Sequence, residues 1–197
     1  IIGKVFYHVD LKKTGSGNIG ATNAYRELGV VAGLSVFICD FLKGFIAVHL
    51  GMPDPLIVLA CAIAAIVGND WSIFLHFKSG KGVACGVGAF AYISAPAVLC
   101  AFAVWLLVFK AKHIVSLSSI IAAPVVALVL LIEGASAEYV IFAALAAVIV
   151  IGKHKDNIKR LHLPHIFIVN LQSITMKNVW IINIMNQHIS YTKYMGE

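Results

Sequence analysis

Three short stretches combine glycines with polar and basic residues, as anion-binding loops do: 15–26 (GSGNIGATNAYR), 77–84 (FKSGKGVA) and 153–161 (KHKDNIKRL). Glycine lets a backbone turn sharply and leaves its N–H groups open to an anion. The stretches also carry hydroxyl, amide, imidazole and basic side chains, which can position or polarise a substrate. If they share one surface, they predict at least two phosphate-binding loops with an imidazole among them.

The first stretch has glycines at 15, 17 and 20 for turning, and it carries these candidate donors and charge: Ser16, Asn18, Thr22, Asn23 and Arg26. Its letters GSGNIG satisfy the dinucleotide pattern G-x-G-x-x-G. That fingerprint requires a preceding buried strand within a βαβ unit, and the sequence predicts neither. The alternative that stays open is a polar loop that caps a helix.

In the second stretch, Gly80 and Gly82 flank Lys81 directly before an apolar segment, and Lys78 adds a further charge. Backbone amides, a helix N-terminus and an ammonium group therefore converge, which predicts a phosphate-binding loop. It is not a Walker A loop, because glycine follows Lys81 where a magnesium-binding Ser or Thr would stand. An ordinary glycine-rich turn at the membrane interface is the structural alternative.

The third stretch places His154, Asn157 and Arg160 at intervals of three, which predicts one side of a helix continuing from the last apolar run. Alone, this pattern is also typical of a basic cluster that anchors a protein to anionic lipid. Three such stretches on one face would favour a shared substrate site.

The composition of the chain is that of a membrane protein, so membrane helices must position these three stretches. The chain is 60% hydrophobic and 12% charged, against roughly 45–50% and about 25% in soluble domains. The net charge of +6 does not indicate nucleic acid, because too few polar residues remain for a basic binding face. The cysteines lie in apolar runs without metal-ligand spacing, which argues against zinc and disulfides: Cys39, Cys61, Cys85 and Cys100.

The apolar runs predict an all-α, polytopic transmembrane bundle, since a spanning helix needs about 20 residues. Ser94, Ala95 and Pro96 divide the longest run into two short helices, because proline breaks a helix. Residues 1–7 resemble a truncated first span, which brings the expected number to about seven. The runs are 30–50, 55–68, 83–109, 114–132 and 138–152.

Alternate threading of these spans puts all three motif stretches on one side. The loops of that side contain eleven basic residues and those of the other side none, which makes the motif side cytoplasmic by the positive-inside rule. Inside the first complete span, Asp40 and Lys43 are expected to pair or to face the bundle interior. The eleven are Lys12, Lys13, Arg26, Lys78, Lys81, Lys110, Lys112, Lys153, Lys155, Lys159 and Arg160.

A second possible acid–base pair is His49 with Asp54, which have the H-x-x-x-x-D spacing of a large class of glycerolipid acyltransferases. Threading puts both residues at the opposite end of the spans from the phosphate-binding loops. We therefore do not expect this pair to act.

Over residues 1–161 the chain resembles the bacterial acyl-phosphate-dependent glycerol-3-phosphate acyltransferases, the PlsY family of inner-membrane enzymes. The family's second motif ends in G-K-G-V-A, as residues 80–84 do. Its first motif, S-G-N-x-G-A-T-N-x-x-R, is matched by Ser16, Gly17, Asn18, Gly20, Ala21, Thr22, Asn23 and Arg26. Its third is matched by His154, Asn157, Ile158, Arg160 and Leu161.

The resemblance implies transfer of a fatty acyl group from acyl phosphate to the sn-1 hydroxyl of glycerol-3-phosphate, giving lysophosphatidic acid and phosphate. It implies a multi-pass monomer in membrane lipid whose active site faces the cytoplasm, without metal, cofactor or nucleic acid. The residues expected in catalysis are Ser16, Asn18, Arg26, Lys81, His154 and Asn157. Those expected to bind substrate are Gly17, Gly20, Thr22, Asn23, Lys78, Gly80, Gly82 and Arg160.

The chain departs from the family pattern in the second motif, where Asn69, Ser72 and Ser79 replace histidine, proline and glycine. The alternative to an active enzyme is therefore an impaired phosphate-binding membrane protein or a small anion transporter.

Composition also changes at the end of the third motif. Residues 1–160 contain 25 alanines and residues 161–197 none, so we expect a transmembrane domain over 1–160 and a tail unrelated to the family over 161–197. The alternative for this tail is an interfacial accessory helix.

Overall fold

The structure is a computed structural model that describes residues 2–72 and 80–162, and within these ranges every regular element is a helix. The chain divides into two units, Ile1–Lys155 and Asp156–Glu197. The helices are α1 (Ile2–Phe6), α2 (Ala21–Leu28), α3 (Val30–Leu50), α4 (Pro55–Asp70), α5 (Val83–Ile93), α6 (Ala95–Lys112), α7 (Val115–Ile132), α8 (Ala137–Lys153) and α9 (Lys155–His162).

The boundaries of the apolar helices follow capping and proline signals. Asp54 begins α4, because its side chain accepts from the N–H of Leu56 at 2.8 Å and proline stands in the first turn. Ser94 separates α5 from α6 and accepts from the N–H of Ala97 at 3.1 Å. The predicted division of the longest apolar run is therefore confirmed.

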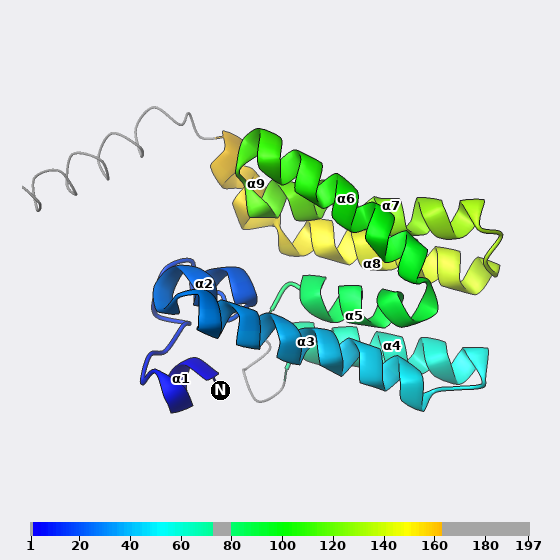
Figure 1. The fold of residues 1–197 in the computed structure, drawn as a ribbon, viewed down its shortest axis with the longest axis horizontal. Helices are drawn as coiled ribbons and strands as arrows, with labels where there is room; N and C mark the ends of the chain where they lie inside the picture. Colours follow the sequence, from blue (N-terminus) through cyan, green and yellow to red (C-terminus); the bar gives the residue numbers. More distant parts are fainter. Residues whose placement is uncertain (1, 73–79, 163–197) are drawn as a thin grey trace, which may run out of the picture. The chain divides into compact units, whose positions relative to one another are not determined.

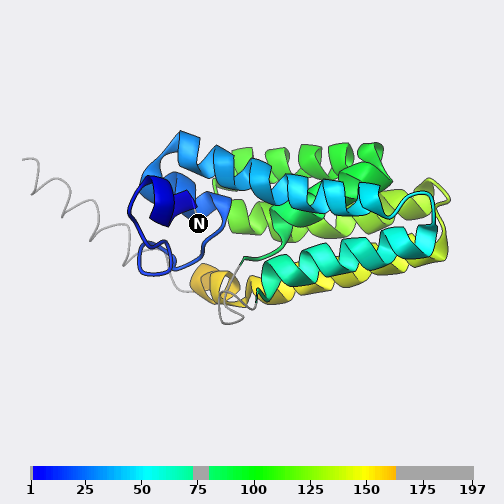
Figure 2. The same ribbon diagram turned by 90° about the horizontal axis from the view of Figure 1, so that it is seen from below.

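Within the first unit, consecutive helices are packed mostly as antiparallel neighbours (Figures 1 and 2). The most extensive contacts join α3 to α5, α6 to α7 and α7 to α8, and the short α2 packs on α3. In both views the α3–α4, α5–α6 and α7–α8 turns lie at one end of the helices. The loop before α2 and the segment entering α5 lie at the other end.

Helices α3 and α5 approach each other so closely that glycine is required on both. A Cβ added at Gly44 would collide with the carbonyl oxygen of Cys85, and one added at Gly88 with that of Phe41. Small residues at such a crossing let helix backbones approach, which is typical of membrane helices. The α3–α5 contact therefore depends on the two missing side chains.

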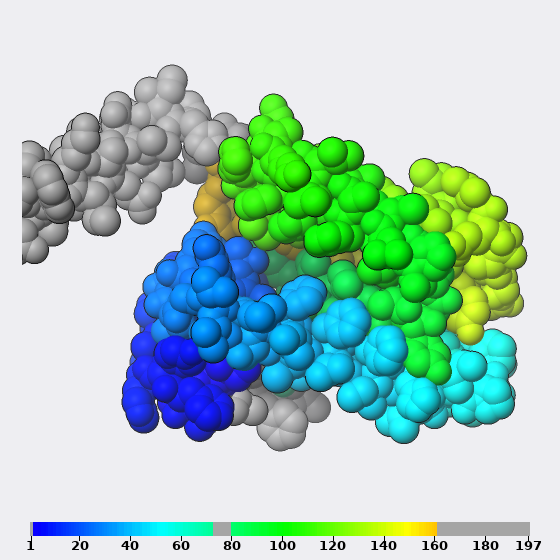
Figure 3. Space-filling model, viewed as in Figure 1, coloured from blue at the N-terminus to red at the C-terminus, as the bar shows by residue number. Residues whose placement is uncertain are grey.

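The outer surface of the helices is apolar, as a lipid-facing surface must be. Figure 3 shows α3 and α6 forming much of one face. Leu34 and Ile46 of α3 and Leu107 of α6 are 55%, 49% and 68% exposed. Helices α3, α6 and α7 are each long and apolar enough to cross a membrane, and α4 and α5 are shorter apolar helices. The all-helical membrane fold is confirmed, while the number of spans stays a prediction.

We predict that Gly88→Ala destabilises the protein by about 1–3 kcal/mol, because the new methyl group overpacks the α3–α5 crossing. The matched control is Gly86→Ala on the same helix, where a Cβ would meet only the Cδ1 of Ile66 at 3.9 Å. The control should unfold at the same or a higher temperature, because alanine favours helix. Thermal unfolding in detergent measures both, and equal midpoints would contradict the close crossing.

Candidate active site

The first motif forms a loop that is tied to α2 by one buried side chain, Asn23. Its Nδ2 donates to the carbonyls of Leu11 at 3.3 Å and Thr14 at 3.1 Å. Its Oδ1 accepts from the backbone N–H and the hydroxyl of Ser16, at 2.9 and 3.1 Å. The motif predicts that Asn23 contacts substrate, whereas in the structure its amide shapes the loop and orients Ser16.

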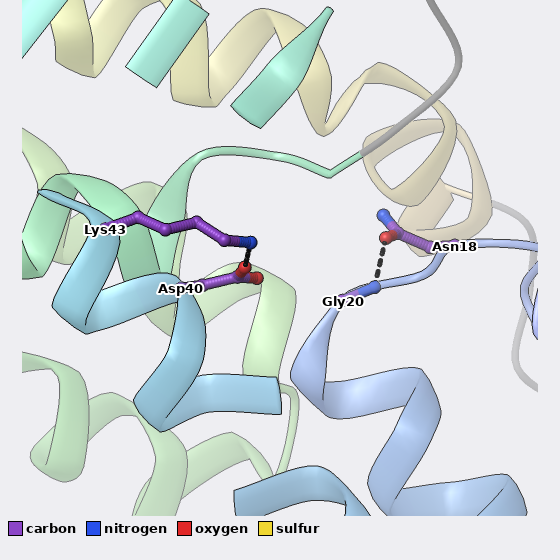
Figure 4. A network of polar contacts seen from close by, with 4 residues as sticks. All are labelled: Asn18, Gly20, Asp40 and Lys43. Carbon is purple, nitrogen blue, oxygen red and sulfur yellow. Dashed lines mark hydrogen bonds and ion pairs between the residues drawn. The ribbon is translucent and has the colours of Figure 1, made fainter. Parts of the chain in front are cut away.

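The neighbouring Asn18 stabilises the entry to α2. Its side-chain oxygen accepts from the N–H of Gly20 at 2.8 Å, and Gly20 is the N-cap residue of the helix (Figure 4). Thr22 and Arg26 lie one turn apart on α2, and both side chains are exposed. The first motif is therefore part loop and part helix, with its basic residue on the exposed side of α2.

The predicted pairing of Asp40 with Lys43 is confirmed. The Lys43 ammonium lies 2.6 Å from a carboxylate oxygen of Asp40, three residues earlier on α3 (Figure 4). This pairing neutralises both charges on an apolar helix, where a lone charge would be costly.

The second motif turns into α5 at Gly82, which is the N-cap of the helix and has a left-handed backbone with φ of 68°. Gly82 has no side chain to cap the helix, and no cap hydrogen bond from the described residues is found, so the first N–H groups of α5 are the part of this motif best suited to an anion. Gly80 and Lys81 are half-buried beside it. Lys78 and Ser79 lie outside the described residues.

Asp70, which none of the sequence motifs includes, is the last residue of α4 and lies beyond the apolar run 55–68. Its side chain is fully buried, and a Cβ at Gly82 would lie 2.8 Å from one of its carboxylate oxygens. Burial raises the pKa of this carboxyl to about 6, although the charge of Lys153 acts in the opposite direction. No spacing pattern marks Asp70, because its burial depends on how α4, α5 and α8 meet.

Lys153, at the end of α8, lies beside the same carboxylate. Its ammonium donates to the backbone carbonyl of Asp70 at 2.8 Å and stands 3.7 Å from the ring centroid of Trp71. Burial lowers the pKa of Lys153, and the charge of Asp70 raises it. The cation–π contact and the hydrogen bond hold this lysine against the end of α4.

His154 is buried, at 4% exposure, directly after α8. Its Nδ1 lies 2.7 Å from the carbonyl oxygen of Val150. Burial lowers the pKa of the imidazole; the Val150 hydrogen bond raises it and the charge of Lys81 lowers it further. A neutral His154 must donate from Nδ1, because a carbonyl only accepts, so its Nε2 carries a lone pair.

The third motif is not one continuous helix, so this prediction is wrong. Helix α8 ends at Lys153 and α9 begins at Lys155. His154 leaves the helical conformation, with φ of −95° and ψ of 8°, while its N–H still bonds the last turn of α8. His154, Asn157 and Arg160 therefore do not share one side of a single helix.

Asn157 and Arg160 belong to the second unit. There the Nε of Arg160 donates to the carbonyl of Asp156 at 3.1 Å. Their expected roles beside His154 stay predictions.

The alternative pair His49 and Asp54 is engaged elsewhere. Asp54 caps α4, and the Nδ1 of His49 lies 3.0 Å from the hydroxyl of Tyr92. Within the described ranges, no group of three or more His, Cys, Asp or Glu side chains could hold a metal ion.

We predict that Asn23→Ala loosens the first motif, because the carbonyls of Leu11 and Thr14 lose their donor, at about 1–3 kcal/mol per buried group. Trypsin cleavage after Lys12 and Lys13 should accelerate about tenfold, as followed by mass spectrometry. The control is Thr22→Ala, which changes the exposed neighbour on α2. Equal cleavage rates in the two variants would show that Asn23 does not hold the loop.

The family model and the similar proteins found by comparison all carry the same description, glycerol-3-phosphate acyltransferase. The glycerol-3-phosphate acyltransferase family model matches residues 1–163. The chain is 42% identical over 163 residues to glycerol-3-phosphate acyltransferase 2 of Moorella thermoacetica, covering 82% of this chain and 84% of that one. It is 43% identical over 157 residues to the Geobacter sulfurreducens enzyme, with 78% and 80% covered.

Two solved structures of PlsY (YgiH), an integral membrane glycerol 3-phosphate acyltransferase, are also similar at 38% identity. The glycerol 3-phosphate form has a TM-score of 0.75 and the match covers 81% of this chain and 83% of that chain. The lysophosphatidic acid form has a TM-score of 0.71, with 81% and 86% covered. Fold, motifs and relatives agree, and the chain belongs to the glycerol-3-phosphate acyltransferase family.

Proposed function

We propose that this glycerol-3-phosphate acyltransferase takes its acyl group from an acyl phosphate and transfers it to the sn-1 hydroxyl. Its products are then lysophosphatidic acid and inorganic phosphate. The two PlsY forms named for glycerol 3-phosphate and lysophosphatidic acid support this direction of reaction. Because phosphate is a good leaving group, the protein needs no nucleophile of its own, and positioning with charge stabilisation suffices.

The buried, neutral His154 is the observation on which this mechanism rests. With Nδ1 donating to Val150, Nε2 is the acceptor that a hydroxyl of glycerol-3-phosphate requires. As the hydroxyl oxygen bonds to the acyl carbon, its proton passes to Nε2 and the bond from the acyl carbon to the phosphate oxygen breaks. The imidazolium then returns the proton to the departing phosphate.

The phosphate groups are held by the other two motifs. Lys81 and the amides of Gly80 and Gly82 bind one phosphate at the N-terminus of α5, where the helix dipole favours an anion. Arg26 and Thr22, exposed on α2, bind the second phosphate or the glycerol.

The hydroxyl of Ser16 and the amide of Asn18 orient the reacting groups, with Gly17 and Gly20 shaping their loop. Asn23 positions Ser16 through its buried hydrogen bonds. Asn157 and Arg160 add a donor and a charge on the cytoplasmic side, and Lys78 adds a charge at the second motif.

The site faces the cytoplasm of a bacterial inner membrane, and the protein acts as a monomer. The eleven basic residues of the motif-side loops support this orientation. Residues 161–197 form a tail outside the transferase domain, supported by the loss of alanine and by a family match that ends at residue 163.

We predict that the purified protein in detergent releases phosphate from palmitoyl phosphate only when glycerol-3-phosphate is present. Ser16→Ala and Lys81→Ala should each lower the rate by at least about 100-fold, a typical loss when a charge-stabilising group is removed. Leu107→Ala, at an exposed position of α6, is the control and should release phosphate at the wild-type rate.

Folded protein that binds glycerol-3-phosphate without releasing phosphate would favour the binding-only alternative. Asn69 and Ser79 of the second motif would then be the first positions to restore to the family residues.

We predict that kcat stays constant as the pH is lowered through the ordinary histidine range and falls only below it. The reason is that burial lowers the pKa of His154 from 6.5, so the base stays neutral to a lower pH. His154→Gln should lose about 100-fold or more in kcat, and His49→Gln should not. An unchanged kcat in His154→Gln would exclude the imidazole as the base.

A further inference from the structure

The carboxyl group of Asp70 is buried at the candidate site, and the proposed acyl transfer assigns it no role. Its side chain has no exposed surface, and neither of its oxygens has a hydrogen-bond partner of good geometry among the described residues. The adjacent Asn69 side chain interacts with the carboxyl and lowers its pKa, without the geometry of a full hydrogen bond. A buried carboxyl without such bonds is costly, so a native site that keeps one calls for an explanation.

This carboxyl is aimed at the N-terminus of α5. A Cβ at Gly82 would lie 2.8 and 3.0 Å from its two oxygens, and one at Gly80 would lie 3.9 Å from Oδ1. Gly82 is the N-cap residue of this 11-residue helix and, lacking a side chain, makes no cap hydrogen bond. The carboxyl therefore faces the same positive helix end, beside Lys81, that suits a substrate phosphate.

Each neighbouring element contributes a charged or titratable group. From α8, Lys153 contacts the backbone of Asp70, and His154 follows it. From α3 comes Asp40, already paired with Lys43. Lys81 precedes the α5 N-terminus, and Cys85 lies in its first turn.

We propose that Asp70 is a proton-dependent binding residue of this site. Of the two substrate phosphates, the one at the Gly80–Gly82 loop is that of glycerol-3-phosphate, and the protonated carboxyl donates its O–H to it. When it is ionised, the carboxylate acts as an internal anion at the α5 N-terminus and opposes that phosphate. The inference rests on the proposed placement of a phosphate at this loop.

The direction of the pH effect follows from the group's surroundings. Burial raises the pKa of Asp70 to about 6, so the carboxyl is mostly protonated near pH 5 and mostly ionised near pH 8. Affinity for phosphate therefore falls as the pH rises through this window. Glycerol-3-phosphate titrates over the same range, so the effect of Asp70 must be read against a variant that cannot ionise.

Asp70→Asn is that variant, because an amide keeps the shape of the carboxyl and still donates a hydrogen bond. KM for glycerol-3-phosphate and kcat are measured from about pH 5 to about pH 8. The ratio of wild-type KM to Asp70→Asn KM should rise about tenfold over this range. A tenfold change corresponds to a difference of about one unit between the pKa of Asp70 in the free and in the substrate-bound protein. Asp54→Asn, at the other end of α4, should follow the wild type at every pH.

A second variant tests the direction independently of Asp70→Asn. Because Lys153 lowers the pKa of Asp70, Lys153→Met should move the midpoint of the KM rise to higher pH. A purely structural Asp70 would leave that midpoint in place. A KM ratio that is constant with pH, or a Lys153→Met midpoint that does not move upward, would overturn the proposal.

A binding measurement tests the role of Asp70 without requiring that acyl phosphate is the correct acyl donor. The increase in unfolding temperature caused by glycerol-3-phosphate should fall with rising pH in the wild type relative to Asp70→Asn. Should Asp70→Asn not fold, the same measurement on wild type and Lys153→Met decides. Absence of turnover with palmitoyl phosphate counts against the proposed acyl transfer, whereas a pH-independent difference in this binding signal refutes the role of Asp70.

Discussion

The close crossing of α3 and α5 is the contact on which the site depends. Gly44 and Gly88 let the two backbones meet without intervening side chains, which sets the N-terminus of α5 relative to α3. Helix α2 and its loop are packed on α3, so the first and second motifs are positioned through the same contact. In a membrane, where burial from water does not drive helices together, such packing carries much of the association.

Polar groups near the site divide into those that hold the scaffold and those available to substrate. The amide of Asn23 forms hydrogen bonds with the loop that carries Ser16, and Lys43 neutralises Asp40 within α3. The N-terminus of α5 at Gly82 and the Nε2 of His154 are the groups to which the proposed mechanism assigns anion binding and proton acceptance. This division explains how a short motif can contain both a rigid support and a reactive group.

Two buried titratable groups near the end of α8, Asp70 and His154, have pKa values shifted in opposite directions. Burial raises the pKa of Asp70 and lowers that of His154, because a low-dielectric surrounding disfavours the charged form of each. Near neutral pH this leaves a neutral imidazole close to Lys81. Lys153 then sits between the aromatic face of Trp71 and the end of α4 as the compensating charge.

Sequence alone determined the helical class, the start of the apolar run at residue 55, the break at Ser94 and the family motifs, because these depend on composition and on residues near in the chain. It left two alternatives for Asp40 and Lys43, pairing or facing the bundle interior, and the structure shows them paired. Tertiary structure decided three further points. It buried Asn23 as a loop support, interrupted the expected helix at His154, and brought Asp70 against Gly82. Each of these depends on contacts or backbone conformation that spacing does not encode, so only the packed chain could show them.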